Sequence, residues 1–80
     1  MSGDTFALRF GAFIRARRLA AGVTQEALAE RIGISQPSIS AWERGEAVPT
    51  AQALLGALRA LKLDIAEVVA LLDDDEPEAA

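Results

Sequence analysis

Two short helical segments joined at Gly33 constrain the fold of this chain more than any other feature of its sequence. Thr24 is a good N-cap for the first segment, and Gly33 permits the sharp turn that ends it. Ser35 is a helix-capping residue for the second segment. The pattern therefore predicts helices over residues 25–32 and 36–44, held at a fixed angle by the packing of the remaining chain.

The predicted helix over residues 36–44 has an apolar inner side and a polar outer side. Ile39 and Trp42 are three residues apart and face inward, so Trp42 is interpreted as a core residue rather than a surface for stacked bases. Pro37 is tolerated in the first helical turn, because an N–H at that position would have no acceptor within the helix. The small and polar residues left outside are Gln36, Ser40 and Ala41. This layout is typical of a helix-turn-helix, whose second helix lies in the major groove of DNA.

Apolar residues at helical spacing predict three further helices, over residues 5–21, 51–61 and 65–72. The apolar side of the first carries Phe6, Phe10, Phe13, Ile14 and Leu19. The stripe of the next carries Leu54, Leu55, Leu58 and Leu61. The stripe of the last carries Ile65, Val68, Val69 and Leu72. Because strand signals are nearly absent, the expected fold class is all-α, a compact five-helix domain.

The composition restricts both the architecture and the class of function. Eighty residues make one small domain, and no apolar run is long enough to span a membrane. The chain contains no Cys, His or Tyr, which removes most residues used in metal sites and general-base catalysis. We therefore expect no catalytic residues, no metal, no cofactor and no enzymatic activity. Because the first residues lack the features of a secretory signal, a cytoplasmic location is expected.

Charge is distributed unevenly along the chain, whose formal net charge is −4. Residues 1–44 carry six Arg against four acidic residues, whereas residues 45–80 carry two basic against eight acidic residues. Most of this acid lies in the tail 73–80, which is predicted to be disordered, so the folded domain is expected over residues 5–72. The tail is interpreted as a solubilising end or, alternatively, as a contact for a basic partner protein or a competitor that reduces non-specific DNA binding.

A series of motifs occurs here in the order found in a known family. They are Arg15 and Arg18 with Gly22, then Thr24-Gln25, Leu28-Ala29, Gly33-Ile34-Ser35-Gln36, Ile39-Ser40, Trp42-Glu43-Arg44-Gly45, Pro49, Leu58, Leu61 and Leu63-Asp64. With these motifs, the run from about Phe10 to Leu72 resembles the lambda-repressor-like (Xre/Cro) helix-turn-helix domains. The resemblance implies a five-helix domain that binds double-stranded DNA, usually as a two-fold homodimer.

The resemblance also implies roles for individual residues. Gln25 would contact phosphate and brace Gln36, which would read a base, most simply adenine through its N6 and N7 atoms. The positions that match base contacts are Gln36, Pro37, Ser40 and Ala41. The positions expected to contact phosphate are Thr24, Gln25, Ser35, Ser38 and Arg44. Glu43 matches an acid that pairs internally with an arginine of the first helix, here Arg18, as a structural ion pair.

The chain departs from the family pattern directly after the predicted reading helix. Many relatives carry basic residues there, but this chain has Glu46-Ala47-Val48, and Ala51 is also uncharged. Since each lost phosphate contact lowers the salt dependence of binding by about one unit, weaker non-specific DNA binding is expected. The leading hypothesis is a DNA-binding transcriptional regulator, a repressor of bacterial or phage type. The alternative is an antitoxin or protein-interaction regulator that binds its partner through the fifth helix or the acidic tail.

Overall fold

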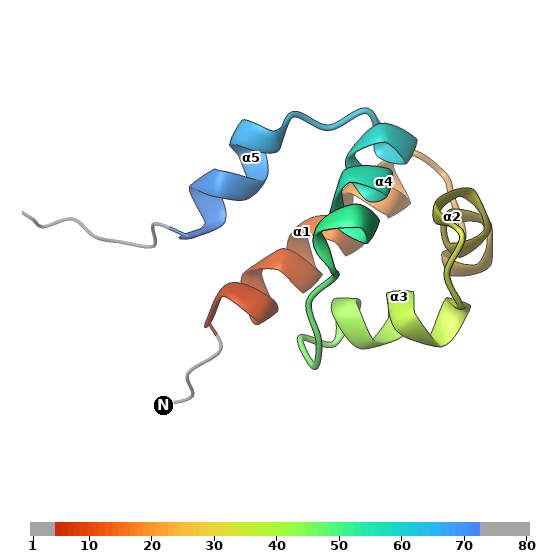
Figure 1. Cartoon of the computed structure of the whole chain (residues 1–80), viewed down its shortest axis with the longest axis horizontal. Coiled ribbons are helices and arrows are strands. Elements are labelled where there is room, and N and C mark those ends of the chain that lie inside the picture. Colours follow the sequence, from red (N-terminus) through yellow and green to blue (C-terminus); the bar gives the residue numbers. More distant parts are fainter. Residues whose placement is uncertain (1–4, 73–80) are drawn as a thin grey trace, which may run out of the picture.

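The computed structural model describes residues 5–72, which form five α-helices and a closing 3-10 turn (Figure 1). The elements are α1 (Thr5–Ala20), α2 (Gln25–Ile32), α3 (Gln36–Glu43), α4 (Ala51–Leu61), α5 (Ile65–Val69) and η1 (Ala70–Leu72). The described residues contain no strand, so the all-α, five-helix prediction is confirmed. The predicted disorder of the tail 73–80 lies outside the described residues. No helix within residues 5–72 is long and apolar enough to cross a membrane.

The helix ends follow the local capping signals. The Thr24 hydroxyl accepts a hydrogen bond from the Ala27 N–H at 3.0 Å, which caps α2. Gly33 ends α2 with a φ of 87°, a left-handed conformation that glycine adopts without steric cost. Ser35 stands at the N-cap of α3, but its hydroxyl does not make the expected capping bond to a helix N–H. It pairs instead with the Ser38 hydroxyl at 2.9 Å.

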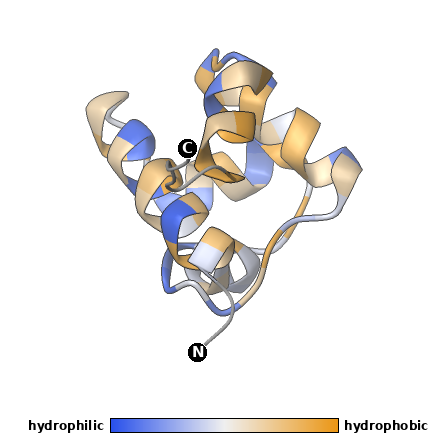
Figure 2. Ribbon diagram, turned by 90° about the vertical axis from the view of Figure 1, so that its left-hand side faces the viewer, coloured by the Kyte–Doolittle hydropathy of each residue, from blue (hydrophilic) through white to orange (hydrophobic). Residues whose placement is uncertain are grey.

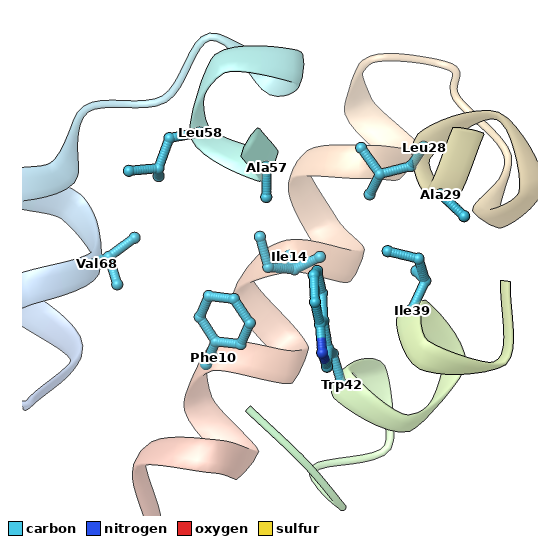
Figure 3. Packing of buried hydrophobic residues seen from close by; sticks show 9 residues of the cluster. All are labelled: Phe10, Ile14, Leu28, Ala29, Ile39, Trp42, Ala57, Leu58 and Val68. Carbon is cyan, nitrogen blue, oxygen red and sulfur yellow. The ribbon is translucent and has the colours of Figure 1, made fainter. Parts of the chain in front are cut away.

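A single hydrophobic core joins all five helices. Figure 3 shows its buried side chains, which are Phe10, Ile14, Leu28, Ala29, Ile39, Trp42, Ala57, Leu58 and Val68. Phe10 of α1 meets Trp42 of α3 edge to face, with 6.0 Å between the ring centroids. Trp42 is therefore a core residue, as its spacing from Ile39 predicts. Figure 2 shows hydrophobic and hydrophilic residues mixed along the helices. Each helix contributes apolar residues to this core.

Two leucines predicted to face the core are exposed. On α1, Ile14 and Arg18 point inward one turn apart, so Leu19, about 100° further round the helix, lies in solvent. On α4, the buried and half-buried positions are Leu54, Ala57, Leu58 and Leu61. Leu55 lies beside this stripe and is exposed, so its assignment to the core was wrong.

The last helix is buried on a narrower stripe than the sequence predicts. Val68 is its one buried residue, whereas Ile65, Val69 and Leu72 are exposed. The prediction of a single helix to residue 72 also needs correction, because the α-helix ends at Val69 and continues as the 3-10 turn η1. The turn η1 packs against α1. Polar contacts from α1 hold α5 and η1: Arg9 donates to the Leu71 carbonyl, and Arg17 pairs with Glu67.

Gly11 allows α1 and α3 to touch backbone to backbone. This glycine is buried, and a Cβ placed on it would overlap the main-chain carbonyl oxygen of Trp42. The same Cβ would lie 3.1 Å from the carbonyl oxygen of Glu43. Any larger residue at position 11 would therefore push the C-terminal end of α3 away from α1. The position of α3 in the fold depends on this close approach.

Candidate nucleic-acid interface

A buried ion pair links α1 to the end of α3. The Nε of Arg18 lies 2.6 Å from Oε2 of Glu43, and its Nη2 lies 2.9 Å from Oε1, so the contact is bidentate. The two side chains are only 9% and 4% exposed. Arg18 also donates from Nη1 to the Val23 carbonyl at 2.9 Å. This is the ion pair expected from the sequence, and it ties together α1, the loop before α2 and the end of α3.

Both members of this ion pair are charged. Burial raises the pKa of Glu43, but hydrogen bonds from Arg18 and Gln25 and the charge of Arg18 outweigh that effect, so the pKa lies below its ordinary value. The hydrogen bond to Glu43 in turn raises the pKa of Arg18. The Glu43 side chain is therefore a carboxylate, which can only accept hydrogen bonds.

Two glutamine side chains extend this ion pair to the surface. Gln25, the first residue of α2, donates from Nε2 to Oε1 of Glu43 at 2.9 Å. Gln36, the first residue of α3, donates from Nε2 to Oε1 of Gln25 at 2.6 Å. We call the four residues Arg18, Glu43, Gln25 and Gln36 the polar chain. It connects the protein interior with the N-terminal end of α3 and contains the brace between Gln25 and Gln36 that the resemblance implies.

The candidate base-contacting residues lie on one outer face of α3. Their positions fall at i, i+1, i+4 and i+5, a spacing that keeps them together on a helix; they are Gln36, Pro37, Ser40 and Ala41. Pro37 is exposed, and the other three are partly exposed. Pro37 and Ala41 also border an apolar groove of about 440 Å³, whose lining includes Val48 and Pro49. The face therefore combines a polar end with an apolar flank.

Arg44, a candidate phosphate contact, is held by a neighbouring acid in this structure. Its Nε and Nη2 each lie 3.0 Å from a carboxylate oxygen of Glu46, and Nη1 donates to the Ser40 hydroxyl. The two side chains of this ion pair are 54% and 60% exposed. Glu46 reaches Arg44 because the intervening Gly45 turns the chain with a φ of 76°. Sequence reasoning noted the missing basic residue at Glu46 but missed this pairing.

The remaining phosphate candidates surround the starts of α2 and α3. Thr24 and Ser35 are the two N-cap residues, and both are exposed. Ser38 lies in the first turn of α3 and shares a hydrogen bond with Ser35. These hydroxyls stand near N–H groups that have no helical partner, and helix N-termini favour phosphate for that reason. The hydrogen bond from Gln25 to Glu43 was also not predicted from the sequence. The polar residues at the start of each helix indicated only the region in which it lies.

Comparison with known proteins places these features in a family. A family model described as a helix-turn-helix domain matches residues 9–71. An uncharacterised HTH-type transcriptional regulator of Methanothermobacter thermautotrophicus is 39% identical over 62 residues, which are 78% of this chain and 90% of that protein. Other curated relatives are longer: the chain spans 41% of the length of two HTH-type regulators of Mycobacterium tuberculosis.

Solved structures show the same arrangement of helices. The P22 c2 repressor, crystallised with a synthetic operator, superposes with a TM-score of 0.70 and 38% identity over 82% of this chain and 96% of that chain. The regulator ClgR from Corynebacterium glutamicum superposes with a TM-score of 0.76 and 30% identity over 82% and 70% of the two chains. The chain belongs to the helix-turn-helix domain family and has the lambda-repressor-like fold.

Proposed function

We propose that this chain is a sequence-specific transcriptional regulator that binds double-stranded DNA and reads the major groove with α3. The observation that carries the proposal is the polar chain, which holds Gln36 at the exposed start of a short helix. Regulators and a repressor among the relatives support the same function. The proposal makes the chain a repressor of bacterial or phage type, acting in the cytoplasm without catalytic activity of its own.

Base recognition in this proposal rests on the outer face of α3. Gln36 donates one N–H to Gln25, which leaves its second N–H and its carbonyl oxygen available for a base edge. Adenine offers a matching acceptor and donor in the major groove. Pro37 and Ala41 have no side-chain hydrogen-bonding group and flank the apolar groove, so they suit contact with thymine methyl groups. Ser40 adds a hydroxyl on the same face.

Phosphate contacts would come from the rim of this face. Gln25 retains one N–H beyond its bond to Glu43, and it opens a helix whose N-terminus favours anions. Thr24, Ser35 and Ser38 supply hydroxyls beside the two helix starts. Arg44 would exchange the Glu46 carboxylate for a phosphate, which is feasible because an exposed ion pair contributes little free energy.

Binding as a homodimer to two half-sites completes the proposal. The exposed apolar residues at the C-terminal end of the described chain support it; they are Ile65, Val69 and Leu72. A second candidate is an antitoxin or protein-interaction regulator that binds a partner protein through α5, which the same exposed residues support, or through the acidic tail 73–80. Co-purification with a basic partner, lost when residues 73–80 are deleted, would favour this second function.

In vitro selection of duplexes from a random pool at low salt tests the first proposal. We expect enrichment of a palindromic sequence whose half-site centres lie about 10–11 base pairs apart, one helical turn. Failure to enrich any duplex at low salt would contradict DNA binding by this chain.

A further inference from the structure

The hydrogen bonds of the polar chain are all donated toward Glu43, from Arg18 on one side and from Gln36 through Gln25 on the other. A carboxylate can only accept, so Gln25 must turn its NH2 group toward Glu43. The carbonyl oxygen of Gln25 then faces Gln36, which must donate to it from its own NH2 group. The orientation of the Gln36 amide at the surface therefore follows from a carboxylate at the opposite end of the same helix.

This orientation decides which base edge Gln36 can satisfy. One of its two N–H groups is used by Gln25, so one donor and one acceptor remain. Adenine presents one acceptor, N7, and one donor, the N6 amino group. Guanine presents two acceptors, N7 and O6, and would need both N–H groups of Gln36. On guanine, O6 would face the Gln36 carbonyl oxygen, and neither atom would have a hydrogen to share.

The geometry points to Glu43 as a positioning residue for base specificity: through Gln25 it locks the Gln36 amide in the orientation that accepts adenine and rejects guanine. This inference rests on the proposed function, because it assigns base reading to Gln36. Arg18 contributes by occupying both carboxylate oxygens of Glu43, which fixes the carboxylate in place. The ion pair thus acts on recognition as well as on the packing of α1 against α3.

Replacing the carboxylate by an amide removes the lock with little change in shape. In Glu43→Gln, the new NH2 group faces an Arg18 donor in either orientation of the amide, so each orientation loses one of the two bonds from Arg18. Residue 43 can then either accept from Gln25 or donate to it. When it donates, both glutamines reverse: Gln25 donates to Gln36, whose two N–H groups then become available for guanine N7 and O6. The variant should therefore tolerate both bases where the wild type selects adenine.

The experiment compares binding to two duplexes, the selected site and the same site with guanine in place of the adenine read by Gln36. A bidentate contact discriminates between bases by on the order of 10- to 100-fold. We expect Glu43→Gln to lower the ratio of the two dissociation constants several-fold at this base pair and at no other. A purely structural role would weaken binding to both duplexes alike and leave the ratio unchanged.

Two further variants keep the test decisive. Gln25→Met interrupts the polar chain but leaves the Arg18–Glu43 ion pair intact, so it should lower the same ratio even if Glu43→Gln fails to fold. Glu46→Gln makes the same chemical change in an exposed carboxylate outside the polar chain and should leave the ratio unaltered.

Gln36→Ala separates base reading by Gln36 from the positioning role of Glu43. If Gln36→Ala relaxes preference at one base pair while folded Glu43→Gln and Gln25→Met retain the wild-type ratio, base reading stands and the positioning role of Glu43 is overturned. If Gln36→Ala changes preference at no base pair, the proposed reading residue and the inference fall together.

Discussion

Glu43 and Glu46 lie three residues apart at the end of α3, and each holds an arginine through two hydrogen bonds. Their surroundings are opposite. Glu43 and Arg18 are buried between α1 and α3, whereas Glu46 and Arg44 stand in solvent. The same pair of functional groups therefore has two different physical consequences.

Burial decides whether an ion pair can exchange its partner. Removing one member of a buried pair leaves an uncompensated charge away from water, so the contact persists. An exposed pair competes with water and salt, so Arg44 can leave Glu46 for a phosphate at little cost. The buried pair is suited to positioning, and the exposed pair is suited to contact with a charged ligand.

The largest difference should appear in stability. Glu43→Ala leaves Arg18 buried without its partner and should lower the free energy of unfolding by about 3–5 kcal/mol. Glu46→Ala should leave the free energy of unfolding unchanged within error, because its pair is exposed. Urea denaturation of the two variants measures both values. Equal losses in the two variants would remove the distinction between the pairs.

The close approach of Gly11 in α1 to the main chain of α3 provides a second test of the buried side of α3. Gly11→Ala places a methyl group against the main-chain carbonyl of Trp42 and should cost about 1–3 kcal/mol of stability. Gly56→Ala is the matched control in α4, because its methyl would lie 3.1 Å from Cγ2 of Ile32, a half-buried side chain that can yield. The gain in helix propensity of about 1 kcal/mol should offset that contact. Thermal unfolding should therefore separate the variants; equal melting temperatures would contradict the close approach of α1 and α3.

The loss of stability at low pH should also depend more on the buried Glu43 than on the exposed Glu46. The folded-state pKa of Glu43 lies below its ordinary value of 4.5, so its contribution to stability is present above that pH and is lost as the pH falls through the lower, folded-state value. Arg44 also lowers the pKa of Glu46, but salt screens that exposed pair. At high salt, Glu43→Gln should flatten the acid loss of stability, and Glu46→Gln should not. Acid unfolding curves of both variants with the same slope would argue against this difference.

The smallest effects concern the exposed pair and DNA. Arg44→Ala should weaken binding to every duplex alike and reduce the salt slope by about one unit. Glu46→Gln should act oppositely, strengthening binding to all sequences modestly, because Arg44 no longer has a carboxylate partner. Titrations over a range of salt concentrations measure both. A change in base preference in either variant would place Arg44 among the base contacts instead.

Local signals allowed much of the fold to be predicted from the sequence. The capping threonine and the left-handed glycine fixed the bounds of α2, and the spacing of Ile39 and Trp42 correctly identified the inner side of α3. Periodicity could not separate Leu54 from Leu55, because neighbouring residues both lie near the same side of a helix. Which of the two is more buried depends on where the other helices pack. The exposure of Ile65, Val69 and Leu72 has the same explanation, because only the side of α5 that carries Val68 packs against the rest of the fold.

The site was predictable only in part, for a geometric reason. The Arg18–Glu43 pair followed from the resemblance to a family with such a pair. The bond from Gln25 to Glu43 depends on the angle between α2 and α3, which no local pattern encodes. The Arg44–Glu46 pair depends on the turn made by Gly45, and the Ser35 hydroxyl found a side-chain partner that competes with its capping role.

The most direct test of the central claim is a comparison of wild type and Gln36→Ala on the selected duplex and on duplexes changed at single base pairs. Gln36→Ala should cost about 1–3 kcal/mol of binding free energy on the selected duplex and nothing on the duplex that already lacks the adenine. An equal loss on every duplex, or no loss on any, would contradict base reading by the start of α3.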